Sequence, residues 1–325
     1  MTSTTGAGSR PLSVGRGLAY VFIAAVAWGT GGAVAAVLYR TSGLGPIAVS
    51  FWRFVVGAVL LVAAAPLLRS SAGSSVRELL RTRPGWLVSI GAGLATSQSA
   101  YFAAVQRSGV AVATIVTLGL GPILIAIGAH ATMGERLGRA GAPTIALALL
   151  GLVLLTSGGD AGPAPLQGLS FAALSGVTYA GAMLLTRAMG RRNGGSDQYR
   201  ITLIGTAIGM VCLLPVAAVE GLLPSSGDPL RSAALLVYLG AVPTALGYAL
   251  FNAGLASVRA TTASVIALME SVTAAVIAVA FLGERMTSLA IAGTVVLMGA
   301  VVILALAERR DSPPADANDA SEPGS

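Results

Sequence analysis

The sequence predicts an all-α polytopic membrane protein, with ten transmembrane helices arranged as two inverted five-helix repeats. Three observations carry this prediction: the scarcity of charge, the number of long apolar runs, and an internal repeat. Of the 325 residues, 55% are hydrophobic and only 10% are charged, and the mean hydropathy is +0.82. Soluble domains contain about 25% charged residues. Much of this chain must therefore face lipid rather than water.

Apolar runs of membrane-spanning length recur along the whole chain. A helix needs about 20 mostly apolar residues to cross roughly 30 Å of hydrocarbon. The runs between charged residues and Pro or Gly breaks give ten candidate helices: 18–38, 46–67, 85–105, 111–131, 140–156, 168–189, 199–219, 232–253, 261–281 and 288–306. The connections between them are too short for an extramembrane domain.

The two ends of the chain are polar and are expected to lie outside the membrane. Residues 1–17 form the predicted N-terminal tail, because the apolar run that follows is long enough to be a retained helix rather than a signal peptide. Residues 307–325 are rich in Pro, Ser and Asp. Such a segment buries too little apolar surface to fold, so we expect a disordered tail.

The distribution of arginine predicts the orientation in the membrane. The net charge of +7 comes from 20 arginines, and the chain contains no lysine. With the N-terminus in the cytoplasm, 15 arginines fall on the cytoplasmic side and 4 on the other, while Arg53 lies inside a span. Positive residues are enriched in short cytoplasmic loops. We therefore expect a multi-pass protein of a bacterial inner membrane, with both termini cytoplasmic and no nucleic acid partner.

An internal repeat relates the two halves of the chain. Residues 91–136 align without a gap on residues 240–285 at an offset of 149, with 14 of 46 positions identical. The most informative match is a Gly-Glu-Arg triplet, which ends an apolar run at 134–136 and again at 283–285. We assign these triplets a structural role, because Gly can cap a helix while Glu stays hydrated and Arg meets the terminal carbonyls.

The predicted repeats cover residues 18–156 and 168–306, and each contains five helices. Since five is odd, the second copy must enter the membrane upside down relative to the first. Inverted repeats are typical of secondary transporters, whose substrate site lies near the midplane where the halves meet. The repeat therefore favours transport over a receptor or a membrane enzyme.

Several motifs of this chain resemble those of the EamA-like transporters in the drug/metabolite transporter superfamily. They are AWGT at 27–30, FWRF at 51–54, LGLGPILIAIGAHATMGERL at 118–137, GAVPTALGYALFNAGL at 240–255 and ALMESVTAAVIAVAFLGERM at 267–286. The resemblance covers residues 18–306 and rests on the order and spacing of the motifs. It implies a 5+5 bundle around a central cavity that moves a small metabolite, often by export.

Helix bending is expected at prolines. Family members often carry Glu-Pro where this chain has Glu270-Ser271, so the sequence gives no reason for a kink at that point. Pro122 and Pro243 lie inside apolar runs, and a proline in a helix interior can bend it.

Glu270 is the leading candidate for a coupling or substrate-binding residue. It is the tenth residue of the run 261–281, which at 1.5 Å per residue places it about 15 Å deep, near the bilayer centre. An unpaired acid there costs several kcal/mol or stays protonated. Protonated, it could couple transport to a proton gradient; ionised, it could bind a cationic substrate group. The alternative is a structural ion pair with Arg53.

The other candidate site residues lie in the same apolar runs. Arg53 could bind a substrate carboxylate, pair with Glu270 or reach the interface, and we favour a structural or gating role. Polar and aromatic residues are candidates for a cavity lining, although each could instead pack or anchor at the interface; they are Trp28, Gln98, Tyr101, Tyr179, Tyr248 and Asn252. In the aligned first repeat, Gly121 and Pro122 take the places of Glu270 and Ser271.

The chemical motifs of other function classes are missing from the sequence. It has no Walker phosphate loop, no Ser/His/Asp or Cys/His arrangement, and one cysteine, Cys212. We expect no catalytic residue, metal or cofactor, and partners limited to lipid, a small-molecule substrate and, in an open alternative, a second copy in a homodimer. The expected function is gradient-driven export of an amino acid or amphipathic cation by alternating access. The alternatives are an importer or permease for another metabolite class, or a membrane enzyme without transport.

Overall fold

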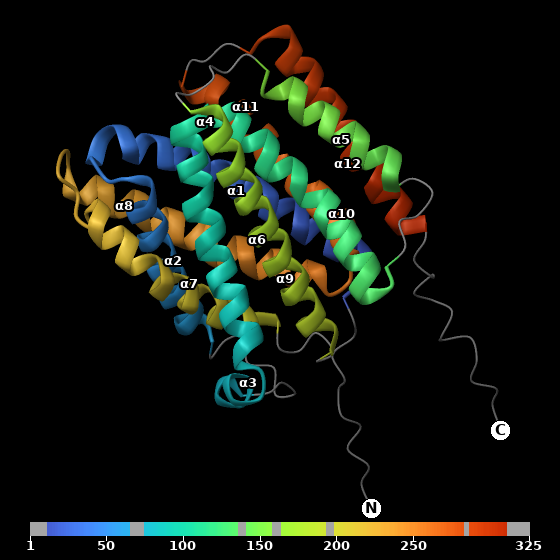
Figure 1. The fold of residues 1–325 in the computed structure, drawn as a ribbon, viewed down its shortest axis with the longest axis horizontal. Coiled ribbons are helices and arrows are strands. Elements are labelled where there is room, and N and C mark those ends of the chain that lie inside the picture. Colours follow the sequence, from blue (N-terminus) through green and yellow to red (C-terminus); the bar gives the residue numbers. More distant parts are fainter. Residues whose placement is uncertain are drawn as a thin grey trace, which may run out of the picture.

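The computed structural model describes residues 12–65, 75–135, 141–157, 164–192, 198–282 and 286–310. All regular secondary structure in these ranges is helical (Figure 1). Within them, eight helices are long and apolar enough to cross a membrane. The all-α, multi-pass membrane fold is therefore confirmed. Most of the predicted tails and the triplet at 283–285 lie outside the described residues.

The first half of the chain forms five helices. They are α1 (Val14–Ser42), α2 (Pro46–Ala64), the short α3 (Val76–Thr82), α4 (Pro84–Met133) and α5 (Gly141–Leu155). The 50-residue α4 joins two predicted helices end to end, and its backbone leaves helical geometry at Gly109, with φ 81° and ψ 162°. Glycine reaches such a positive φ without steric cost. The two predicted spans 85–105 and 111–131 therefore meet at Gly109 rather than at a loop.

The second half contains more interruptions. Its elements are α6 (Pro165–Arg192), α7 (Gln198–Glu220), α8 (Pro229–Leu239), the π-helical turn η1 (Gly240–Leu246), α9 (Gly247–Leu255), α10 (Ala260–Ala267), α11 (Met269–Leu282) and α12 (Ser288–Arg310). Pro243 lies in η1. The predicted run 232–253 thus contains α8, η1 and α9 in series, and the run 261–281 is divided into α10 and α11.

The division between α10 and α11 occurs at Leu268, where neither proline nor glycine is present. There the chain makes tighter bonds to the third residue back, from Leu268 N to Val265 O at 3.1 Å and from Ser271 N to Leu268 O at 3.0 Å. A 3₁₀ turn inside a longer helix often marks a hinge. No bend is expected here from the residue types, yet the helix changes its geometry two residues before Glu270.

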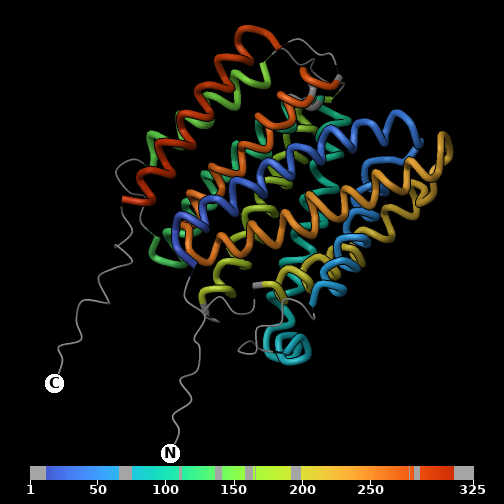
Figure 2. The backbone as a smooth tube through the Cα atoms, turned by 180° about the vertical axis from the view of Figure 1, so that it is seen from behind, coloured from blue at the N-terminus to red at the C-terminus, as the bar shows by residue number. Residues whose placement is uncertain are grey.

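The two halves interleave rather than pack as separate units. Helix α1 packs on η1, α9 and α11 of the second half, while α6 packs on α4 of the first. Figure 2 shows α1, in blue, running beside the orange helices α9 to α11. Two further pairs of helices cross between the halves, α2 with α7 and α5 with α12. Any cavity near the centre is consequently lined by both repeats.

Glycines set the distance of closest approach where helices of the two halves cross. A Cβ atom built on Gly29 of α1 would lie 2.5 Å from Thr273 Cβ and 2.6 Å from Glu270 O of α11. The corresponding crossing of α6 on α4 uses Gly176, where a Cβ would lie 3.1 Å from Thr117 O. Small residues allow helix backbones to approach closely in membranes. Gly29 therefore places α1 directly against the backbone of Glu270.

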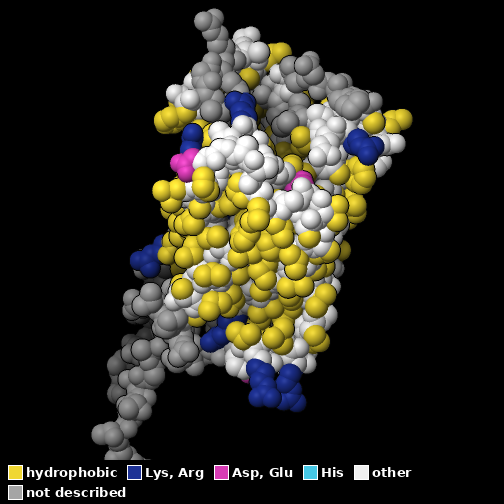
Figure 3. Space-filling model, turned by 90° about the vertical axis from the view of Figure 1, so that its left-hand side faces the viewer, with side chains coloured by type: hydrophobic (Ala, Val, Ile, Leu, Met, Phe, Trp, Pro, Cys, Tyr) yellow, Lys and Arg dark blue, Asp and Glu magenta, His cyan; other side chains and the backbone are white. Residues whose placement is uncertain are grey.

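The outer surface and the two ends agree with a protein that sits in lipid. In Figure 3, hydrophobic side chains cover the middle of the visible face and charged ones lie mainly at its margins. Helix α1 begins and α12 ends on the same side of the molecule, where the Arg309 guanidinium adjoins Gly15. We call this side the terminal end, and the side with Ser42 and Pro46 the opposite end.

The first Gly-Glu-Arg triplet is only partly as expected. Gly134 ends α4 with φ 65°, which confirms the predicted glycine cap. Glu135, expected to be hydrated, instead has a side chain that is only 9% exposed and forms an ion pair with Arg187 of α6 at 2.7 Å. That part of the prediction is wrong, because a helix more than 50 residues away in sequence covers the carboxylate. Arg136 lies outside the described residues.

Candidate functional site

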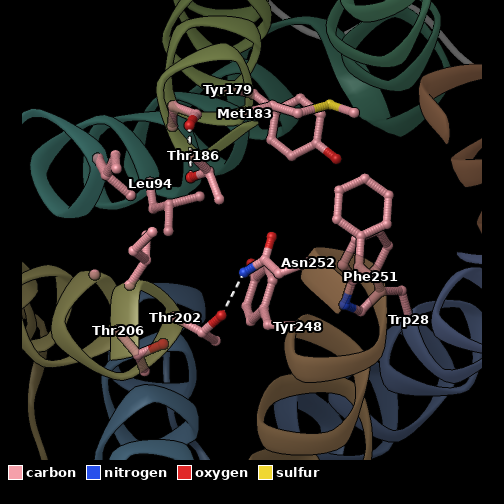
Figure 4. A pocket seen from close by; sticks show the side chains of 14 residues that line it. Trp28, Leu94, Tyr179, Met183, Thr186, Thr202, Thr206, Tyr248, Phe251 and Asn252 are labelled. Carbon is pink, nitrogen blue, oxygen red and sulfur yellow. Dashed lines mark hydrogen bonds between the residues drawn. The ribbon is translucent and has the colours of Figure 1, made fainter. Parts of the chain in front are cut away.

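A small cavity lies between α1, α4, α6, α7 and α9 (Figure 4). Its volume is about 30 Å³, which is room for roughly two water molecules and not for a metabolite. Both halves contribute to its wall, which consists of Trp28, Ile90, Leu94, Tyr179, Ala182, Met183, Thr186, Ile201, Thr202, Gly205, Thr206, Tyr248, Phe251 and Asn252. Four predicted site residues, Trp28, Tyr179, Tyr248 and Asn252, are thus brought together.

One wall of the cavity is aromatic. The ring of Trp28 lies 5.4 Å from that of Tyr248 and 4.8 Å from that of Phe251, measured between centroids. The indole Nε1 of Trp28 is buried and has no hydrogen-bond partner among the described residues. A Cβ atom at Gly247 would lie 2.9 Å from this nitrogen. Gly247 therefore makes the space in which the indole ring of Trp28 reaches the cavity.

The facing wall is polar but carries no Arg, Lys, His, Asp or Glu. Asn252 Nδ2 donates a hydrogen bond to Thr202 Oγ1 at 2.5 Å, and both side chains are buried. In Figure 4 the amide of Asn252 stands between Thr202 and the aromatic residues. Thr186 donates back to Ala182 O of its own helix at 2.8 Å. The cavity thus pairs an aromatic surface with neutral hydrogen-bonding groups.

Two charged residues lie just outside this lining. The charges of Arg53 on α2 and Glu270 on α11 both act on Tyr248. Glu270 also acts electrostatically on Tyr179, and on Tyr101. The site therefore has a guanidinium group and a carboxyl group close to one cavity-lining tyrosine.

Arg53 and Glu270 are not joined by an ion pair in this conformation. The pairs within the described ranges are Arg187 and Arg191 with Glu135, and Arg259 with Glu308. The Arg53 Nε atom is buried without a hydrogen-bond partner among the described residues, and its guanidinium carbon lies 5.9 Å from the centroid of the Phe54 ring. Both charges are thus left with capacity to bind another group.

The remaining predicted residues lie farther from the cavity. Tyr101 is hydrogen-bonded to Thr114 at 3.1 Å between the two oxygens, and Gln98 is half-buried on α4 and absent from the lining. Pro122 is buried within α4, whose one non-helical residue is Gly109. Pro243 is buried within η1. The structure thus brings these four residues to the surrounding helices and not to the cavity wall.

Helix α7 contributes four lining residues, none of which is among the candidates predicted from the sequence. Thr202, Gly205 and Thr206 are spaced at i, i+3 and i+4, and this spacing places them on one helix face. Small and hydroxyl-bearing residues on one face of an otherwise apolar span are the sequence feature that could have predicted this part of the cavity wall.

Comparison with known proteins gives one consistent result. The model of the EamA-like transporter family matches residues 15–157 and again residues 166–306. An uncharacterised transporter of Bacillus subtilis, YwfM, is 27% identical over 90% of this chain and 94% of its own length. An uncharacterised transporter of Archaeoglobus fulgidus is 28% identical over 88% of this chain and 95% of its own. A solved crystal structure with 21% sequence identity covers 91% of this chain and 99% of its own with a TM-score of 0.72, which shows a shared fold.

Proposed function

Since the chain belongs to the EamA-like transporter family, we propose that it is a secondary active exporter of a small metabolite that works by alternating access. The observation that carries the proposal is the cavity between the two halves, with Glu270 beside it and in no ion pair among the described residues. A cavity at the meeting of two repeats is where secondary transporters bind their substrates.

The proposed topology has ten crossings in a bacterial inner membrane, with residues 18–156 and 168–306 as the inverted repeats and both termini in the cytoplasm. Gly109 supports the count, because it divides α4 into the segments 84–108 and 110–133, each longer than the about 20 residues that one crossing needs. The interleaved packing of α1 on the second half and α6 on the first supports the repeat. The arginine excess at the terminal end supports the orientation.

The proposed substrate is an amphipathic cation or an amino acid. The face of an aromatic ring attracts cations, and Trp28, Tyr179, Tyr248 and Phe251 form the cavity's aromatic wall. Glu270 supplies a counter-charge for an ammonium group, while Arg53 supplies one for a carboxylate. The neutral groups of Asn252 and Thr202 would orient the rest of the molecule. An anionic metabolite fits less well, because the lining itself carries no Arg, Lys or His and the charge of Arg53 acts against that of Glu270.

The proposed coupling uses the Glu270 carboxyl group as a shared site for a proton and for the substrate ammonium. Binding of one displaces the other, so that an inward proton gradient drives outward movement of the substrate. The 3₁₀ turn at Leu268 gives α11 a point about which Glu270 can move relative to α10. Since the cavity holds only about 30 Å³, substrate entry requires the surrounding helices to separate.

A ligand-stabilisation screen tests the proposal. Detergent-purified protein is heated with amino acids, amines, quaternary ammonium compounds and organic anions, since a ligand that binds the folded state raises its apparent stability. We expect stabilisation by cationic or zwitterionic compounds in the unaltered chain. The Asn252→Ala variant should lose that stabilisation while still unfolding cooperatively. Stabilisation by organic anions alone, or an equal response of the variant, would contradict the assigned site.

A further inference from the structure

A buried ion pair lies at the terminal end of the molecule. Arg187 Nε of α6 is 2.7 Å from Glu135 Oε1, just beyond the end of α4, and the two side chains are only 8% and 9% exposed. Arg191, one helical turn further along α6, reaches the same oxygen at 3.3 Å but is 49% exposed. The Glu135–Arg187 pair is thus the shielded core of the cluster, with Arg191 at its rim.

The same two side chains also hold the turn between α9 and α10. Glu135 Oε2 accepts a hydrogen bond from Ala260 N, the first residue of α10, at 3.2 Å. Arg187 Nη1 donates to Leu255 O, the last residue of α9. One carboxylate of the first repeat and one guanidinium of the second therefore fasten α4, α6, α9 and α10 at a single point.

This fastening point adjoins the cavity. Thr186, the residue before Arg187, lines the cavity, and Asn252 lies three residues before Leu255 on α9. Separating α6 from α9 at this end would open the cavity between them. That movement requires Arg187 to release Leu255 O and Glu135 to release Ala260 N.

A second carboxylate holds the start of α10 without joining the cavity walls. Glu308 of α12 accepts from Arg259 N at 2.9 Å and from Thr262 Oγ1 at 2.7 Å. It fastens α10 to α12, which contributes no residue to the cavity lining. Glu308 therefore serves as a comparison for Glu135, since both carboxylates hold the start of α10, but Glu135 is paired with Arg187 whereas Glu308 acts on Arg187 through its charge alone.

The energetics of a buried ion pair suit a contact that opens and closes. The cost of removing two charges from water offsets much of their mutual attraction, so such a pair contributes little net stability. Separation into water therefore costs little, because each charge regains its hydration. Removal of one partner alone leaves the other buried and uncompensated, which favours the state in which it is hydrated.

We propose that Glu135 and Arg187 form a latch that closes the cavity toward the terminal end and releases when α6 separates from the α9–α10 turn. The proposal rests on the proposed transport function, since a latch implies a cycle. It assigns Glu135 a role that differs from that of Glu308, although both hold α10. The latch can be tested without knowing the substrate.

Cysteine accessibility tests the latch. The exposed Cys212 is replaced by serine, Thr206→Cys places a reporter in the cavity wall, and a membrane-impermeant maleimide is applied to inside-out and right-side-out vesicles. We expect Glu135→Gln to increase the fraction of molecules in the open state and thereby to raise the labelling rate about tenfold. The increase should be seen only when the maleimide is applied from the terminal end. Glu308→Gln should leave the rate unchanged. Equal labelling from both sides, an equal response to Glu308→Gln, or no response to Glu135→Gln would overturn the latch.

If Glu135→Gln alone fails to fold, a double variant still tests the latch. Glu135→Gln with Arg187→Gln leaves no uncompensated charge and retains hydrogen-bonding groups. We expect it to unfold cooperatively and to show the same faster labelling. Loss of folding in the double variant would assign the pair to fold maintenance and overturn the proposal. Because labelling requires no flux, the latch and the transport function can fail independently.

Discussion

The segments that occupy equivalent places in the two repeats have different shapes. Residues 110–133 of α4 keep helical backbone angles through Gly121 and Pro122. Their counterpart is divided into α10 and α11 at Leu268, and carries Glu270 where the first copy has Gly121. The proline-containing copy is the continuous one, and the copy with the acid is interrupted. The comparison indicates that the interruption of the helix accompanies the acid rather than the proline.

The crossing helices repeat this difference. Gly29 of α1 meets the backbone of α11 at Glu270 more closely than Gly176 of α6 meets the backbone of α4 at Thr117. A closer approach leaves less room for a side chain, so the crossing at Glu270 is the more tightly specified of the two. Substitutions at these positions therefore test whether the two crossings differ in tightness.

The largest effect is expected for Gly29→Ala. Its methyl group would lie 2.5 Å from Thr273 Cβ and 2.6 Å from Glu270 O, and overpacking of this kind typically costs about 1–3 kcal/mol. Thermal unfolding in detergent should show a clear loss of stability. Gly32→Ala on the same helix is the control, since nothing lies within 4 Å of its Cβ position. Equal stability of the two variants would remove the special status of this crossing.

An intermediate effect is expected for Ser271→Pro. Proline in a helix interior costs about 3 kcal/mol, partly because its ring clashes with the carbonyl four residues back. Ser271 N bonds instead to Leu268 O, three residues back, so the regular helical ladder is already interrupted at this position. We therefore expect a loss of about 1 kcal/mol, the value of one hydrogen bond. Ala274→Pro, farther along α11, should cost the full amount. If Ser271→Pro proves as damaging as Ala274→Pro, the helix is not interrupted at Leu268.

The smallest effect is expected for Gly176→Ala. The added methyl group would lie 3.1 Å from Thr117 O and 3.2 Å from Leu120 Cβ, which a slight shift of the helices can relieve. The gain in helix propensity, about 0.5–1 kcal/mol, offsets much of the remaining cost. Unfolding temperatures should place this variant between Gly29→Ala and the unaltered chain. A loss as large as that of Gly29→Ala would show that both crossings are equally tight.

The spans and the aromatic part of the site could be predicted from sequence because they depend on local composition. Trp28, Tyr179, Tyr248 and Asn252 stand out as polar or amphipathic groups within apolar runs, and all four line the cavity. Gln98 has the same character but lies outside the lining, since the rotation of α4 depends on its partners.

The features that escaped prediction depend on contacts between distant segments. The turn at Leu268 contains no proline or glycine that would predict it. The seven-residue α3 is too short to show a periodic pattern of apolar residues. The place of Thr186 in the cavity wall could not be predicted, because a threonine in an apolar helix commonly bonds to its own backbone, as Thr186 does. Glu135 resembled a hydrated residue at a helix end, and its burial depends on Arg187 from α6.

The most direct test of the central claim is flux through Glu270→Gln in proteoliposomes. The substrate is the compound identified by ligand stabilisation, and a pH gradient is imposed across the vesicle membrane. Glu220→Gln is the control, because Glu220 caps α2 through Ala48 N at 2.6 Å, away from the cavity. We expect Glu270→Gln to abolish gradient-driven flux while its unfolding temperature stays near that of the unaltered chain, and Glu220→Gln to retain flux. Gradient-driven flux that persists in Glu270→Gln, or that is lost only together with folding, would contradict the assignment of Glu270 as the coupling residue.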